Sequence, residues 1–301
     1  MCRSLTFAFS LLFLSAMGAR ADSIAQSVLS DPIHDVTHPA RIEVVHIPTH
    51  GVKVNGVFYL ASGAGAHPTM IFLHGMPGNE QNLDLAQAVR RLGWNVLTFH
   101  PRGSWGSPGQ YSHAHVIEDG LAALAFVRDP EAAERYGVDR QTIVVAGHST
   151  GGFAAPNIIA RAAPVAGMVL VSGADEAAEA SVARKSPATW RAFVAEYEEM
   201  ESLVGCTPRS VTEELLHHEK DWSYAALAQK IANVPALIVT ANDGYAEVGQ
   251  SLADRMNATG GRVEVVHFDT DHSYSDHRIS LETTVTGWLG RQFPESLGSK
   301  P

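Results

Sequence analysis

The residues with the most informative chemistry are a serine and the glycines on either side of it. Residues 147–151 read Gly-His-Ser-Thr-Gly, a Gly-x-Ser-x-Gly pattern centred on Ser149. A β-branched apolar run at 143–146 precedes it and predicts a buried strand, and residues 153–163 are compatible with a helix. Strand, sharp turn and helix together indicate a nucleophile elbow, in which small neighbours leave room for a strained serine backbone. The bare pattern also occurs in ordinary glycine-rich loops, so the rest of the chain must decide whether Ser149 is a nucleophile.

A serine hydroxyl is a weak nucleophile at neutral pH, so a histidine must accept its proton and an acid must orient that histidine. Asp243 lies in the turn after an apolar strand predicted at 236–240. His272 lies in the loop after the last predicted strand, which ends at residue 268. The chain thus offers nucleophile, acid and base in the order Ser149, Asp243, His272, and we interpret them as a catalytic triad.

Other residues near His272 are weaker candidates for the acid and the base. His267 lies inside the last strand, where the pleat fixes its side chain. Asp271 adjoins His272, so we expect its side chain to point elsewhere. His277 lies five residues further along, beside Asp276, whose position is typical of a charge at a helix N-terminus.

Acyl transfer also needs hydrogen-bond donors for the developing oxyanion, and one of them comes from a second loop. The amide of Thr150 is one candidate, because it follows the nucleophile at a helix N-terminus. The strand predicted at 69–73 ends in His-Gly-Met-Pro-Gly, where the glycines allow a sharp turn, and the amide of Met76 is the second candidate. Taken alone this loop reads as a plain strand-to-helix turn, but beside the triad the oxyanion role is favoured.

The elements that must position these residues alternate along the chain. Strands are predicted at residues 41–47, 52–60, 69–74, 95–100, 142–146, 166–171, 235–240 and 262–268. Helices are predicted at 81–92, 115–128, 151–163, 247–257 and 280–291. This alternation predicts an α/β fold with a mostly parallel sheet covered on both faces, and an opening hairpin that adds antiparallel pairing at one edge.

Residues 175–233 interrupt the alternation. This stretch is long, acidic and helical in pattern, and it contains no clear strand. Apolar and aromatic residues recur along it at helical spacing: Trp190, Phe193, Tyr197, Met200 and Val204. Such a stripe is usually buried as core. Because the insertion falls between the sixth and seventh strands, we also expect it to form a short helical cap above the elbow, part of which faces substrate.

Bulk properties limit the classes of partner. The chain has 301 residues and a formal net charge of −10, with no basic patch, which argues against nucleic acid as a partner. The sequence has two cysteines, Cys2 and Cys206, and we expect Cys206 to be a packed or half-exposed thiol rather than a nucleophile. The histidines lack convincing metal-ligand spacing, so the sequence predicts neither a metal nor another cofactor.

The N-terminal residues have the pattern of a targeting segment. A short positive start, an apolar run at 5–17 and the small-x-small sequence Ala19-Arg20-Ala21 predict a secretory signal peptide over 1–21, with Asp22 as the first mature residue. The apolar run is too short for a comfortable membrane span. We therefore expect a secreted or periplasmic protein without stable membrane insertion, in which residues 22–301 form a single domain.

Several motifs together resemble the α/β-hydrolase superfamily. They are His74-Gly75-x-Pro77-Gly78, the segment from Arg102-Gly103 to Pro108-Gly109, Gly147-His148-Ser149-Thr150-Gly151-Gly152, Asp243 and His272. The resemblance covers about residues 41–293 and is nearest to single-domain esterases and serine peptidase-like hydrolases. It implies an eight-stranded sheet with a short cap, the triad above, and an oxyanion hole formed by Met76 and Thr150. The sequence Phe-His-Pro-Arg-Gly at 99–103 departs from the usual pattern, and Arg102 is expected to brace loops.

The leading functional hypothesis is a secreted serine hydrolase that cleaves carboxylic esters of small molecules through an acyl-enzyme. A serine peptidase or amidase would use the same residues, and the acids at 196, 198, 199 and 201 could then grip a substrate amine. A third hypothesis is a hydrolase fold that only binds ligands, since fold alone does not prove activity. The sequence indicates neither the acyl group nor the oligomeric state.

Overall fold

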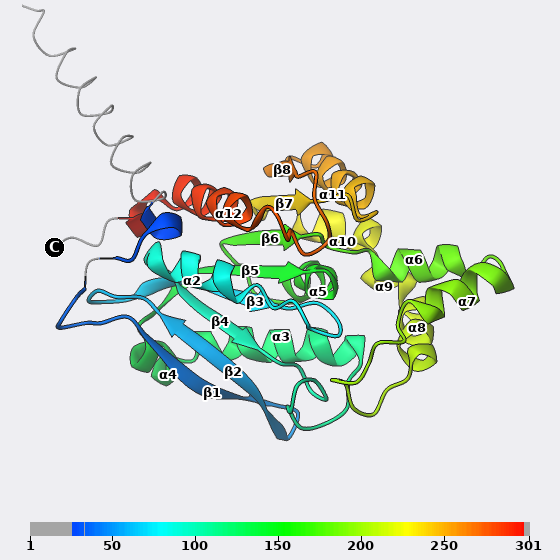
Figure 1. Cartoon of the computed structure of the whole chain (residues 1–301), viewed down its shortest axis with the longest axis horizontal. Coiled ribbons are helices and arrows are strands. Elements are labelled where there is room, and N and C mark those ends of the chain that lie inside the picture. The colour runs from blue at the N-terminus through cyan, green and yellow to red at the C-terminus, as the bar shows by residue number, and fades with distance from the viewer. Residues whose placement is uncertain (1–25, 33, 298–301) are drawn as a thin grey trace, which may run out of the picture.

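The computed structural model describes residues 26–32 and 34–297, and its centre is one eight-stranded sheet (Figure 1). The predicted signal peptide lies outside the described residues. The strands are β1 (Arg41–Thr49), β2 (Val52–Leu60), β3 (His67–Leu73), β4 (Asn95–Phe99), β5 (Val138–His148), β6 (Gly167–Val171), β7 (Ala236–Thr240) and β8 (Val263–His267). Their order in the sheet is β1-β2-β4-β3-β5-β6-β7-β8.

The pairing confirms the predicted mostly parallel α/β architecture. β1 pairs antiparallel with β2, and β2 antiparallel with β4, whereas every neighbouring pair from β4 to β8 is parallel. The central strands β3, β6 and β7 are buried along their whole length, as expected for strands covered on both faces. β5 begins at Val138, earlier than the predicted residue 142. Val138 already pairs with His67, and an irregularity then shifts the register before Ile143 pairs with Thr69.

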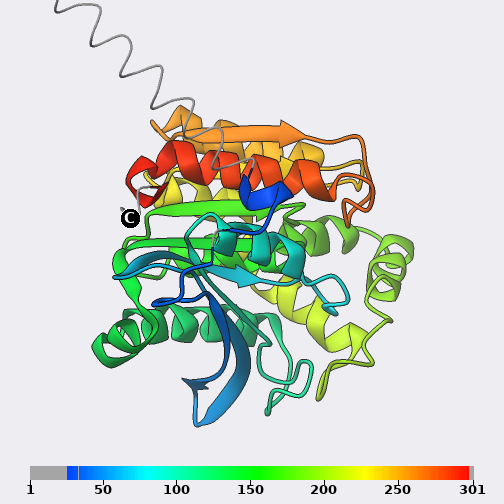
Figure 2. The ribbon, with the colours of Figure 1, turned by 60° about the vertical axis from the view of Figure 1, so that its left-hand side comes forward.

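Helices cover both faces of the sheet (Figure 2). In chain order they are α2 (Leu83–Arg91), α3 (His113–Arg128), α4 (Pro130–Tyr136), α5 (Thr150–Ile159), α11 (Ala246–Ala258) and α12 (Arg278–Gln292), followed by a 3₁₀ turn, η1 (Pro294–Leu297). The helix α4 was not predicted from the sequence. It has a clear local cause: Asp129 caps its N-terminus, Pro130 occupies its first turn, and Gly137 ends it at φ 60°.

Alternating residues of the strands supply two apolar cores. On β5, Ile143 and Val145 belong to the core beneath α3, α4, α5 and α11, while Val144 and Ala146 belong to the core beneath α2 and α12. All four side chains are at most 1% exposed. This two-sided burial fixes the register of β5, since a slip by one residue would exchange the two faces, and it therefore fixes where the chain leaves the sheet at Ser149.

Residues 175–233, referred to below as the cap, consist of helices joined by turns and by a longer non-helical stretch at 196–207. They form α6 (Glu176–Ala183), α7 (Pro187–Ala195), α8 (Pro208–His217), α9 (Glu219–Trp222) and α10 (Tyr224–Ile231). In Figure 1, α6, α7 and α8 gather at the end of the molecule toward which the parallel strands point. The predicted apolar stripe does not lie on one helix, because α7 ends at Ala195. Its residues also differ in burial, since Phe193 and Tyr197 are buried whereas Val204 is 61% exposed.

Within the described residues, no helix is both long enough and apolar enough to cross a membrane.

A buried ion pair ties the loop after β4 to α3. The Arg102 guanidinium donates from Nε to Asp119 Oδ1 at 2.8 Å, and the Arg102 amide donates to Oδ2 at 2.7 Å. Asp119 is fully buried and also accepts the Thr49 hydroxyl of the opening hairpin, at 2.7 Å. Arg102 Nη2 reaches the partly exposed Glu118 at 2.5 Å. Arg102 therefore joins the hairpin, the loop and α3, which matches the bracing role expected from the sequence.

We predict that Asp119→Ala lowers the free energy of unfolding by about 3–5 kcal/mol, because the buried Arg102 charge loses its partner. Urea denaturation followed by circular dichroism measures the change. The control is Glu213→Ala on α8, where both side chains of the Arg209–Glu213 pair are exposed and the expected change is within about 0.5 kcal/mol. Equal effects of the two substitutions would contradict the bracing role.

Candidate active site

Ser149 lies at a strained turn between β5 and α5. Its backbone has φ 54° and ψ −120°, a conformation that L-residues rarely adopt. Its amide donates to the carbonyl oxygen of Val171, at the end of the neighbouring strand β6, at 3.1 Å. The serine therefore follows directly from the buried strand and precedes a helix, as the sequence predicts for an elbow.

The turn leaves no room for side chains at the glycines around it. A Cβ on Gly147 would lie 2.1 Å from the carbonyl oxygen of Gly151. A Cβ on Gly151 would lie 2.1 Å from the carbonyl oxygen of Leu73, at the end of β3. Both contacts are with backbone atoms, which cannot move aside without displacing a strand or the helix. Steric contact, rather than a left-handed backbone, therefore requires glycine at these two positions.

The loop after β3 lies against the serine. A Cβ on Gly75 would lie 2.9 Å from Cβ of Ser149 and 3.4 Å from its Oγ. Met76, whose amide is the second oxyanion candidate, is the next residue. The loop is held by the indole of Trp105, which donates to the carbonyl oxygen of Pro77 at 2.7 Å. The structure thus brings together the two loops that the sequence assigns to an oxyanion hole.

The side chain of His74 fixes the start of this loop. Its Nδ1 donates to the carbonyl oxygen of Gly75 at 2.7 Å, since a carbonyl can only accept. Burial lowers the pKa of His74 to about 4, so the ring is neutral at pH 7. The neutral ring then accepts at Nε2 from Nδ1 of His100, at 3.1 Å. This histidine pair could not be predicted from the sequence, because His74 follows β3 and His100 follows β4, and only the pairing of these strands brings the two rings together.

Asp243 and His272 are in direct contact. Nδ1 of His272 donates to Oδ2 of Asp243 at 2.8 Å, which leaves Nε2 as the basic nitrogen of the neutral ring. The Asp243 side chain is 4% exposed, and that of His272 is 36% exposed. Burial alone would raise the pKa of Asp243, but hydrogen bonds from His272 and Ser172 hold that pKa below its ordinary value. Asp243 therefore stays ionised and orients a histidine that solvent can reach.

Among the hydrogen bonds between described residues, none joins the Ser149 hydroxyl to His272. In enzymes without substrate, catalytic hydrogen bonds are often long and tighten only in the complex. His148, the residue before Ser149, lies next to His272, and the centroids of the two rings are 4.6 Å apart. Nε2 of His148 donates to the carbonyl oxygen of His272 at 2.9 Å. His272 is thereby tied to the elbow through backbone and ring contacts.

The weaker candidates for acid and base have other partners. The two ring nitrogens of His267 contact Thr240 and Asn242, each at 3.0 Å. His277 pairs with the adjacent Asp276 at 2.9 Å. Asp271 accepts backbone amides of its own turn. In the part of the chain that the structure describes, no group of three or more His, Cys, Asp or Glu side chains is arranged to hold a metal ion.

With this geometry in place, comparison with known proteins assigns the family. A sequence profile described as "Alpha/beta hydrolase family" matches residues 70–279. The chain belongs to the alpha/beta hydrolase family. The predicted resemblance and fold are both confirmed.

Solved structures of other hydrolases share the fold of this family member. An esterase of Pyrobaculum calidifontis superposes with a TM-score of 0.64 at 19% identity, covering 92% of each chain. A thermophilic carboxylesterase cloned from a metagenomic library gives 0.59 at 20% identity, covering 92% of this chain and 97% of its own. An acylaminoacyl peptidase of Pyrococcus horikoshii gives 0.62 at 15% identity, covering 84% of this chain and 42% of its own.

Curated relatives are more similar in sequence over a shorter stretch. Uncharacterized proteins from two strains of Mycobacterium tuberculosis are 31% identical over 129 residues, which is 42% of this chain. The chain spans 44% of the length of these relatives.

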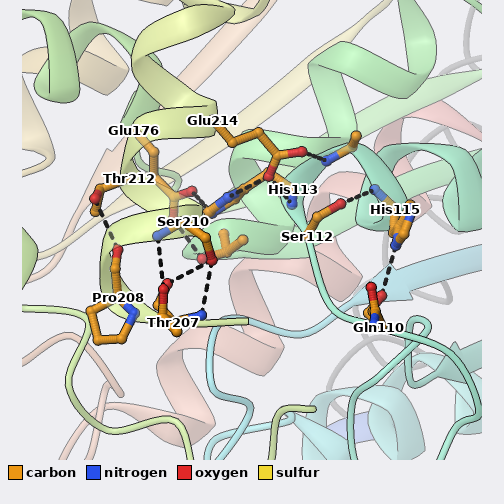
Figure 3. Close-up of polar contacts among 12 residues, drawn as sticks. Gln110, Ser112, His113, His115, Glu176, Thr207, Pro208, Ser210, Thr212 and Glu214 are labelled. Carbon is orange, nitrogen blue, oxygen red and sulfur yellow. Dashed lines mark hydrogen bonds and ion pairs between the residues drawn. The ribbon is translucent and has the colours of Figure 1, made fainter. Parts of the chain in front are cut away.

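A charged cluster that sequence reasoning missed lies where helices of the cap meet α3 (Figure 3). The Thr150 hydroxyl donates to Oε1 of Glu176, the first residue of α6, at 2.5 Å. Oε2 of Glu176 lies 3.0 Å from Nε2 of His113, the first residue of α3. Glu214 of α8 lies on the other side of the ring, with Oε2 3.5 Å from Nδ1. His113 is fully buried and Glu176 is 5% exposed, whereas the Glu214 side chain is 20% exposed, so the cluster joins the cap to the body of the protein through a largely buried contact.

The two carboxylates determine the charge of His113. Burial alone would lower the pKa of His113, but Glu176 and Glu214 outweigh it and raise the pKa to about 9. Burial likewise tends to raise the pKa of Glu214, and His113 holds that pKa below its ordinary value. At neutral pH the cluster therefore contains a histidinium between carboxylates.

We predict that the contribution of His113 to stability disappears in mild alkali. Because the folded-state pKa of about 9 exceeds the ordinary 6.5, this contribution is complete below pH 6.5 and is lost as the pH rises through 9. The difference in unfolding free energy between wild type and His113→Asn should shrink by about 3 kcal/mol from pH 6 to pH 10. Urea titrations across this range measure it, with His217→Asn at an exposed site as the control. A difference that does not vary with pH would contradict the charged state.

Proposed function

We propose that this alpha/beta hydrolase is a serine esterase that cleaves carboxylic esters of small molecules through an acyl-enzyme. Ser149 is the nucleophile, His272 the general base and acid, and Asp243 the residue that orients His272. The amides of Met76 and Thr150 donate to the oxyanion. The observation that carries the proposal is the 2.8 Å hydrogen bond between Asp243 and His272 at the same end of the sheet as the strained turn of Ser149.

Each chemical step follows from these roles. Oγ of Ser149 attacks the ester carbonyl carbon while Nε2 of His272 takes the hydroxyl proton, and the carbonyl oxygen becomes an oxyanion. The C–O bond to the leaving group then breaks, and His272 returns the proton to the departing alkoxide, which leaves as an alcohol. A water molecule next attacks the acyl-enzyme, giving its proton to His272. Collapse of the second oxyanion releases the carboxylic acid and returns the proton to Ser149.

The cap favours an ester over a peptide substrate. An aminopeptidase of this kind would need acidic side chains held within the site to grip the substrate ammonium. The acids of the cap that the sequence offers for this purpose are all exposed to solvent: Glu196, Glu198, Glu199 and Glu201. The buried carboxylate of Glu176 is already engaged by Thr150 and His113. An ester needs no such grip, and its alkoxide leaves more readily than an amine.

We predict that Ser149→Ala lowers kcat/KM for p-nitrophenyl esters by about a thousandfold or more, because no other group forms the acyl-enzyme. In the wild type, p-nitrophenyl esters of some acyl length should turn over faster than aminoacyl p-nitroanilides. Steady-state assays of the purified protein against both substrate series measure both results.

The matched control is Ser251→Ala at an exposed position of α11, which should keep wild-type turnover. Faster turnover of anilides would favour a peptidase. A fluorophosphonate probe that reacts with neither the wild type nor Ser149→Ala would favour a binding protein without catalysis. Full ester turnover by Ser149→Ala would overturn the proposed nucleophile.

We also propose that residues 1–21 direct export, so that the enzyme acts in the periplasm or outside the cell. The support is the sequence pattern: a short positive start, an apolar run and a small-x-small site at 19–21. When the full chain is produced in a bacterium, intact-mass and N-terminal analysis of the exported protein should give Asp22 as the first residue. Retention of residues 1–21 in a cytoplasmic product would contradict export.

A further inference from the structure

Among the first three residues of α5, only Thr150 has a side chain with which neighbouring elements can form contacts. Thr150 begins the helix, and Gly151 and Gly152 follow it, because the backbone contacts around the elbow exclude a Cβ at both glycines. In the proposed mechanism the amide of Thr150 faces the developing oxyanion, and the Thr150 side chain is the nearest group through which its position can be set. The Thr150 hydroxyl donates a 2.5 Å hydrogen bond to Glu176.

Glu176 is itself fixed from two sides. Asp175, the residue before it, caps α6 by accepting the amide of Ala178 at 3.3 Å, and it also accepts the amide of Tyr224 at 3.0 Å. On the other side, Oε2 of Glu176 contacts His113 at 3.0 Å. Because Glu176 is 5% exposed and His113 is fully buried, water does not compete for these groups. The carboxylate thus has a defined place relative to both α3 and α5.

Glu214 completes the support of His113. Its carboxylate accepts hydrogen bonds from the amides of His113 at 2.8 Å and Ala114 at 3.3 Å. Both amides lie in the first turn of α3, where the helix itself supplies no acceptor for them. It therefore holds both the backbone and the ring of His113 from α8. Figure 3 shows Glu176 and Glu214 reaching His113 from separate helices of the cap. The chain of contacts runs from α8 through α3 and α6 to the residue after the nucleophile.

We propose that Glu176 is a positioning residue of the esterase: through the Thr150 hydroxyl it sets the orientation of the Thr150 amide in the oxyanion hole, and His113 and Glu214 hold Glu176 in place. This inference rests on the proposed function. It makes the cap part of the catalytic apparatus, since the carboxylate that supports the oxyanion donor belongs to α6. Glu176 does not contact substrate, and its effect passes through Thr150.

The alternative is that the cluster only fastens the cap to the body of the protein. The two roles predict different effects of substitutions on kcat, KM and stability. Misplacing an oxyanion donor weakens transition-state binding, so it lowers kcat and leaves KM nearly unchanged. A loosened cap alters the substrate pocket, so it raises KM and lowers stability.

The experiment compares Thr150→Val, Thr150→Ser, Glu176→Gln and the double variant Thr150→Val/Glu176→Gln on a p-nitrophenyl ester. Thr150→Val removes the hydroxyl at nearly constant shape and should lower kcat about tenfold, with KM within about twofold of wild type. Thr150→Ser retains the hydroxyl and should recover most of that loss. The double variant should be no slower than Thr150→Val, because both substitutions break the same link. The pre-steady-state burst of p-nitrophenol should slow in parallel, which places the effect in acylation.

The matched control is Glu213→Gln, an exposed carboxylate on α8 adjacent to Glu214, which should keep wild-type kcat and KM. Wild-type kcat in Thr150→Val, or equal losses in Thr150→Val and Thr150→Ser, would overturn the inference. So would losses that multiply in the double variant and lie in KM. If Glu176→Gln does not fold by circular dichroism, the Val and Ser variants of Thr150 decide the question. Equal background rates in wild type and Ser149→Ala would instead overturn the proposed function, and the inference with it.

Discussion

The constraint on which the rest of the structure depends is steric: the turn at Ser149 brings three backbone segments so close that side chains cannot lie between them. The positive φ of Ser149 costs about 1–3 kcal/mol, and it persists because surrounding elements fix both ends of the turn. β5 fixes one end through its two-sided burial and its pairing with β3 and β6. The other end, the start of α5, has glycine at two of its first three positions and so has few side chains to pack. Its contacts must come from outside: the Thr150 hydroxyl reaches Glu176, and the Tyr224 hydroxyl donates to the carbonyl oxygen of Gly152 at 3.0 Å.

Two buried charged groups on the same helix meet this need. At the start of α3, His113 lies between carboxylates of the cap, and six residues further along α3 Asp119 holds Arg102 and the opening hairpin. A buried ion pair is often no more stabilising than apolar residues of similar volume, but removing one partner is costly because the other charge is left without compensation. Such pairs therefore specify geometry more than they add stability. In this protein they fix α3, and α3 packs closely against α5, where a Cβ on Gly120 would lie 2.2 Å from Cδ1 of Ile158 near the end of α5.

The sequence was sufficient for features whose causes are local or periodic. Apolar runs of β-branched residues predicted the eight strands. The glycines at 147 and 151 indicated the elbow, because the backbone around the turn leaves no room for a larger residue at either position. The contact of Asp243 with His272 follows from topology, since parallel strands end at one edge of the sheet. The cluster of His113, Glu176 and Glu214 could not be predicted in this way. Its members are 63 and 38 residues apart in sequence, on helices whose packing is set by tertiary contacts, and each alone has the pattern of an ordinary surface residue. The short helix α4 was missed for a different reason, as seven residues are too few to show helical periodicity.

The histidines show how burial and neighbouring charge decide the electrostatics of the site. His148 is buried and His74 is half-buried, neither with a carboxylate in contact, and burial lowers their pKa values to about 3 and about 4. His113 is fully buried, yet two carboxylates keep it charged. Because His148 is neutral, its ring adds no full positive charge 4.6 Å from the ring of His272. A histidinium at that position would repel the positive charge that the proposed mechanism places on His272 during attack by Ser149. Asp243 is ionised and lies 2.8 Å from His272, so in the proposed mechanism it stabilises the imidazolium that attack by Ser149 would create.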